Sequence, residues 1–114
     1  MQYYFDIKQQ LNSIISKNSI DFSYAASIDL EKNNDYKDVT DGRIYKNFLS
    51  TEEGHHIRSG NGFTFSINTD GCNPSNKSLI SIWPVFLTIN EIPIGDRYCM
   101  ENVIIAGIYI KIYG

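Results

Sequence analysis

The chain of 114 residues is poor in the side chains that usually mark a metal or redox centre. It has two cysteines, Cys72 and Cys99, and two histidines, His55 and His56, without a Cys-x-x-Cys or mixed Cys/His cluster. Structural zinc usually takes four such ligands at short spacings. We therefore expect idle or buried thiols, solvated histidines in a polar loop, and a cytoplasmic or nuclear setting.

Long apolar runs and a strong charge of one sign are also missing. No segment reaches the ~18 uninterrupted apolar residues of a membrane span, and MQYYFDIKQQ lacks the pattern of a secretory leader. We expect an intracellular protein that does not bind a membrane. The formal net charge is -3, from 10 basic and 13 acidic residues. Without an overall basic field, the chain by itself should bind nucleic acid poorly.

Motifs for nucleotide binding and nucleophilic catalysis are absent as well. Gly54, Gly60 and Gly62 do not form a Gly-x-Gly-x-x-Gly or Walker pattern between a strand and a helix. No Ser, Cys or Lys has the local context of a known nucleophile. No group of residues in the sequence therefore supports a pocket for a small ligand.

What the chain does have is enough apolar material for one packed domain, at 42% apolar and 13% aromatic residues. Apolar side chains recur at steps of three and four from Tyr3 to about Lys17, which predicts an amphipathic helix. A second short helix is predicted from Thr40 or Asp41, which can cap it, to Leu49.

Three strands are predicted after the helices, over Phe63–Thr69, about Leu79–Asn90 and about Asn102–Tyr113. The first alternates and should be half-buried, whereas the other two are apolar at nearly every position and should be buried on both faces. The sequence thus predicts an α+β fold. N-terminal helices and irregular segments occupy residues 1–62, and a three-stranded antiparallel meander occupies 63–114.

Within this scheme, Trp83 is expected to be core packing, and Pro84 should sit at an edge or a local break of the ladder. The basic residues Lys77, Arg97 and Lys111 are isolated in the sequence. We expect them to be solvated charges at strand ends and turns.

Asp70 is the candidate functional residue. It follows the first strand directly and enters a glycine turn, a position from which a carboxylate can hold a divalent metal against a phosphodiester. The Asp-Gly dipeptide taken alone favours a simpler role, a turn aspartate that caps its own corner. Glu91 and Glu101 flank the second hairpin, too far along the strands to share a metal with Asp70.

Three segments in order carry a family likeness: DGCNPSNKS, SIWPVFLTINEIPIGDRY and MENVIIAGIY. Their combination resembles the opening strands of the catalytic domain of CACTA-type and related DDE transposases. There an Asp-Gly turn precedes a Ser-x-Trp-Pro strand, an Asn-Glu-Leu-Pro-like turn and a Glu-Asn-x-x-x-Ala-Gly strand. The likeness is strongest over about Asp38 to Ile108, where YKDVTDGRIYKNFL looks like the segment that precedes the catalytic strand in these proteins. After Gly107 the relatives continue with Trp or Phe, whereas this chain reads IYIKIYG.

The resemblance implies the start of a ribonuclease-H-like fold, in which Asp70 is the first acidic residue of the triad. Intact relatives would cut and join DNA strands with Mg²⁺ or Mn²⁺, in the nucleus if the transposase is eukaryotic. Because the second Asp and the closing Glu have no counterpart here, we expect this chain to be inactive alone and to bind no metal stably. The alternative is a non-catalytic module whose exposed sheet is completed by its own copy or a partner chain.

Overall fold

The computed structural model describes residues 1–17, 24–28, 30, 38–69, 71 and 79–112. It is an α+β fold with a four-stranded antiparallel sheet, in which the strand order is β1-β4-β3-β2. The strands are β1 (Gln2–Tyr4), β2 (Phe65–Thr69), β3 (Ile80–Ile89) and β4 (Val103–Ile112). The helices are α1 (Ile7–Ile15), α2 (Arg43–Leu49), α3 (Glu52–Arg58) and α4 (Ile94–Arg97), with short 3₁₀ turns at Tyr24–Ser27, Val39–Asp41 and Met100–Asn102.

The predicted meander is confirmed for β2, β3 and β4, but the prediction of three strands is wrong. A fourth strand, β1, pairs antiparallel with β4, with Tyr3 opposite Ile108. The helix expected from Tyr3 therefore begins only at Ile7, where the Asp6 side chain accepts a hydrogen bond from the Gln9 amide. Pairing with a distant strand overrides the local helical spacing of the first residues.

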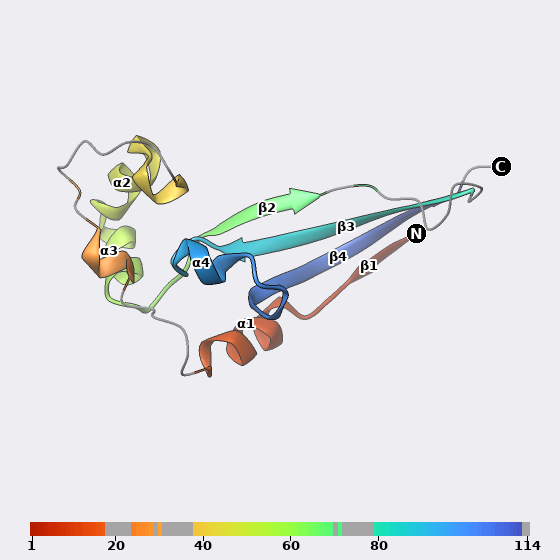
Figure 1. The fold of residues 1–114 in the computed structure, drawn as a ribbon, viewed down its shortest axis with the longest axis horizontal. Helices are drawn as coiled ribbons and strands as arrows, with labels where there is room; N and C mark the ends of the chain where they lie inside the picture. The colour runs from red at the N-terminus through yellow and green to blue at the C-terminus, as the bar shows by residue number, and fades with distance from the viewer. Residues whose placement is uncertain (18–23, 29, 31–37, 70, 72–78, 113–114) are drawn as a thin grey trace.

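The sheet is longer than its helical cover. Figure 1 shows the helices gathered at one end, while β3, β4 and β1 run away from them to the other. The molecule measures 54 × 30 × 25 Å, and its radius of gyration is 16.9 Å. A compact chain of this length would have a radius near ~13 Å. The prediction that β3 and β4 are buried on both faces is therefore wrong for their far ends, where Ile80 and Ile112 are exposed.

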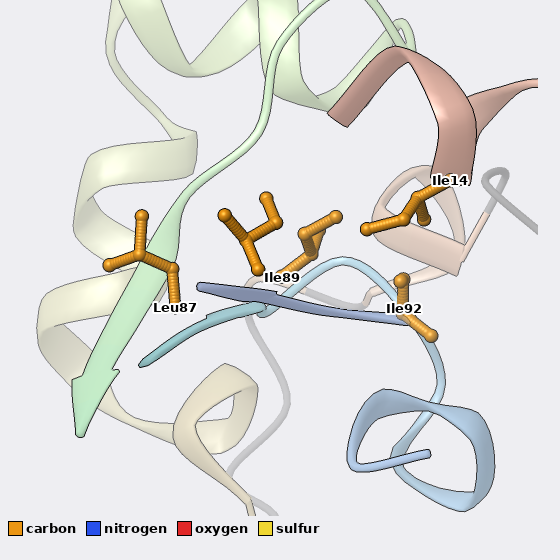
Figure 2. Close-up of a cluster of buried hydrophobic side chains, with 5 residues drawn as sticks. Ile14, Leu87, Ile89 and Ile92 are labelled. Atoms are coloured by element: carbon orange, nitrogen blue, oxygen red, sulfur yellow. The ribbon is translucent and has the colours of Figure 1, made fainter. Parts of the chain in front are cut away.

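Two small hydrophobic cores hold the covered end. The first joins α1 to the sheet through Ile14, Leu87, Ile89, Ile92 and Ile104 (Figure 2). The second joins α2 to α3 through Tyr45, Leu49 and Ile57. Each fully buried aliphatic side chain contributes roughly 1.5–3 kcal/mol relative to its exposed state.

Pro84 lies where the ladder is irregular, as predicted. The pairing between β3 and β4 shifts its register between Val85 and Phe86, and β2 ends opposite Val85. Pro84 thus lies just beyond the paired length of β2, where a missing amide proton costs little. Trp83 beside it is 41% exposed, so the prediction that it is core packing is wrong.

Gly54 permits the close contact between α2 and α3. A Cβ at this position would overlap the Phe48 carbonyl oxygen and the Leu49 backbone. We expect Gly54→Ala to lower the free energy of unfolding by about 1–3 kcal/mol through overpacking. Urea denaturation followed by circular dichroism measures this. In the control Gly95→Ala, a Cβ would meet nothing within 4 Å, so stability should stay equal or rise slightly. Equal stability of both variants would contradict the close packing.

Candidate functional site

The position of Asp70 is defined only through its neighbours, because Asp70 itself lies outside the described residues. The strand before it, β2, ends at Thr69. After it, Gly71 packs against the indole of Trp83, and a Cβ on Gly71 would lie 2.6 Å from a ring carbon. Gly71 is thus in contact with β3 at Trp83.

The described residues do not provide a metal site on their own. They contain no group of three or more His, Cys, Asp or Glu side chains placed to hold an ion. The Glu91 carboxylate bonds to Thr64, at the end of β2 opposite Thr69. Thr69 follows Thr64 by five residue steps of extended chain, about 17 Å. Glu91 therefore lies far from Thr69, the residue that precedes Asp70.

The histidines do not form a site either. His55 and His56 belong to α3 rather than to the polar loop expected from the sequence, and both are exposed. Adjacent positions on a helix point in different directions, which does not suit binding of one ion. Cys99 is a free, exposed thiol, and Cys72 lies outside the described residues. Within the described part, no helix has the length and apolar character needed to cross a membrane.

The most elaborate polar arrangement lies at the other end of β2, around Glu91. This side chain is 1% exposed, and its carboxylate accepts three hydrogen bonds. The donors are the Tyr45 hydroxyl at 2.7 Å, the Thr64 hydroxyl at 2.7 Å and the Thr64 amide. Because Tyr45 belongs to α2 and Thr64 precedes β2, the carboxylate joins the helical pair to the sheet.

Arg97 forms a second polar link beside the first. Its side chain is completely buried and forms an ion pair with Asp38, which caps the turn before α2. It also donates to the carbonyl oxygens of Asn90 at 2.9 Å and Ile92 at 3.1 Å. The prediction that Arg97 is a solvated charge is therefore wrong. We call Asp38, Tyr45, Thr64, Asn90, Glu91 and Arg97 the junction cluster.

Electrostatics in the junction cluster favour the ionised pair. Burial tends to raise the pKa of Asp38, but the hydrogen bonds and positive charge of Arg97 outweigh it, so this pKa lies below its usual value of 3.8. Burial tends to lower the pKa of Arg97, and its bonds to Asp38 raise it overall. Both groups are thus charged at neutral pH.

The junction cluster replaces backbone pairing where the β2–β3 ladder ends. The Asn90 amide still donates to the Thr64 carbonyl oxygen at 3.0 Å. In a regular antiparallel pair, the Thr64 amide would return a bond to the Asn90 carbonyl. Here the Thr64 amide donates to Glu91, and the Asn90 carbonyl accepts from Arg97. Two charged side chains therefore satisfy the backbone groups at this end of the sheet.

A groove of about 820 Å³ lies beside the junction cluster, between α2 and the start of β2. Its walls are mainly apolar, from Val39, Ile44 and Phe48, and Thr64 and Asn90 contribute the polar part. Sequence reasoning did not find this groove or the junction cluster. The one sequence feature that pointed to the junction cluster was the polar pair Asn90 and Glu91 directly after a run of apolar strand residues.

Comparison of the chain with protein-family models, with curated proteins and with solved structures gives no match.

The ion pair in the junction cluster predicts a pH-dependent effect of Asp38→Asn. Since the folded-state pKa of Asp38 is lowered, its contribution is complete above the unfolded pKa and is lost as pH falls through the folded pKa. At pH 7 the variant should lose about 3 kcal/mol or more of unfolding free energy, because Arg97 is left buried without its anion.

Urea denaturation at a series of pH values measures this effect. The difference between wild type and Asp38→Asn should shrink below pH 4 as the wild-type carboxyl is protonated. Asp96→Asn, which removes an exposed carboxylate from α4, is the matched control and should stay near wild type. A deficit in Asp38→Asn that is the same at every pH would argue against the ion pair.

Proposed function

We propose that the chain is the opening part of a ribonuclease-H-like catalytic domain of the DDE transposase type. Asp70 would be one ligand of the Mg²⁺ or Mn²⁺ ions with which such a domain cuts and joins DNA strands. The observation that carries the proposal is the antiparallel meander β2, β3, β4, whose edge strand β2 ends at the residue before Asp70. The sequence likeness assigns the same order to the strands and the same place to the acid.

The contact between Gly71 and Trp83 supports the same proposal. It joins two separate pieces of the family likeness, the Asp-Gly turn and the Trp-Pro strand. Glycine lets the indole ring lie this close, because a Cβ would be 2.6 Å from its nearest atom. The strand β1 on the outside of β4 is an addition to the expected meander.

Catalysis by such a domain needs more than one carboxylate, because two ions must be held on either side of the reacting phosphate. The described residues contain no group of three or more His, Cys, Asp or Glu side chains that could hold an ion, so the proposal requires further ligands from outside the described residues. Until they are supplied, the chain should not cut DNA.

A second function is favoured by a different observation. The far part of the sheet exposes Ile67, Ile80 and Ile112, and the edge strands β1 and β2 have no outer neighbour among the described strands. Exposed apolar strands and open edges are surfaces at which other chains pair or pack. The second candidate is therefore a non-catalytic module that joins its own copy or a partner chain through the sheet.

Paramagnetic Mn²⁺ tests the first proposal without requiring activity. Carboxylate oxygens suit this ion. When Mn²⁺ is titrated into the protein, the amide NMR signals of Thr69 and Gly71, the neighbours of Asp70, should broaden most. Asp70→Asn should remove it, while Asp96→Asn should leave it in place. With plasmid DNA and Mg²⁺ or Mn²⁺, wild type and Asp70→Asn should both leave the DNA uncut. Broadening at Thr69 that persists in Asp70→Asn would refute the assignment of Asp70.

A further inference from the structure

The strand β2 presents its outer backbone groups to no other strand of the described sheet. It occupies one end of the order β1-β4-β3-β2. The bond from the Asn90 amide to the Thr64 carbonyl shows that Thr64 faces β3. Since successive residues of a strand alternate, Ser66 and Asn68 also turn their amides and carbonyls toward β3. The backbone groups at Phe65, Ile67 and Thr69 therefore point outward.

This open edge lacks the features that usually prevent pairing. Edge strands are commonly protected by lysine, proline, inward-pointing charges or a covering helix. Residues 61–69, NGFTFSINT, contain no charged residue and no proline. At the centre of the strand, the apolar side chain of Ile67 is 73% exposed. Figure 1 shows β2 along the border of the sheet, without a helix beside its outer side.

We propose that β2 pairs with β2 of a second copy of this chain, antiparallel about a two-fold axis at Ile67. The inference rests on the second candidate function and names its partner and surface. The two four-stranded sheets would form one continuous sheet across the dimer. In this register Phe65 faces Thr69 of the second copy, and Ile67 faces its own counterpart.

Two observations favour a second copy as the occupant. The outward groups at positions 65, 67 and 69 are symmetric about Ile67, so an identical strand matches every donor with an acceptor. The uncharged edge creates no repulsion between copies and no preference for a charged partner.

Sedimentation velocity over a concentration series tests the proposal. The wild-type chain should show a monomer–dimer equilibrium. Ile67→Lys places two ammonium groups against each other at the axis and should raise the dissociation constant at least about tenfold. The matched control is Ile112→Lys, which changes an exposed isoleucine at the far end of β4 and should dimerise like wild type. A monomer at every concentration would overturn the proposal. The proposal would also be overturned if Ile67→Lys dimerised as tightly as wild type. Loss of the dimer in Ile112→Lys together with its retention in Ile67→Lys would place the interface elsewhere.

Amide hydrogen exchange gives a second readout on the unmodified chain, so the test does not depend on how Ile67→Lys folds. The amides of Phe65, Ile67 and Thr69 should exchange more slowly as protein concentration rises. Those of Ser66 and Asn68, bonded to β3, should be protected at all concentrations. Exchange at Ile67 that does not depend on concentration would also overturn the proposal. Asp70→Asn should dimerise like wild type, so a failure here leaves the Mn²⁺ result for Asp70 unaffected.

Discussion

The hydrogen bonds of the buried Glu91 carboxylate connect the helices to the sheet, and the rest of the fold depends on them. A charged group without water is costly unless hydrogen bonds surround it, and Glu91 receives three from Tyr45 and Thr64. No cation among the described residues bonds to it; the positive charge of Arg97 pairs with Asp38 instead. The α2–α3 core and the sheet core are separate hydrophobic clusters, and the junction cluster connects them.

The same interaction determines which surfaces stay open. By taking the Thr64 amide and the Asn90 carbonyl, Glu91 and Arg97 end the β2–β3 ladder and hold the helices at that end of the sheet. The outer side of β2 and the far ends of β3 and β4 are left without helices (Figure 1). Both proposed functions use the part of the sheet that the helices leave uncovered. The first uses Asp70, which follows β2, and the second uses the outer edge of β2.

The sequence predicted those parts of the fold that local chemistry decides. Runs of β-branched residues predicted β3 and β4 nearly to the residue. The predicted helix ending at Leu49 is present, but the prediction that Thr40 or Asp41 caps it is wrong, because its N-cap is Gly42. Sequence reasoning failed where a distant partner decides: Tyr3 joins a strand because β4 lies beside it, and Arg97 is buried because Asp38 reaches it. Of the candidate site, Asp70 stays a prediction. The junction cluster could not be predicted, since it combines residues from three separate segments.

Amide exchange at Thr64 tests the role of Glu91 most directly. In the wild type we expect slow exchange, although this amide has a side-chain carboxylate and not a strand as its acceptor. In Glu91→Gln its exchange should accelerate selectively, because one acceptor oxygen is replaced by a donor, while Ser66 in the ladder keeps its protection. If Thr64 exchanges at the same rate in both proteins, or if Ser66 loses protection to the same extent, Glu91 does not hold the helices to the sheet.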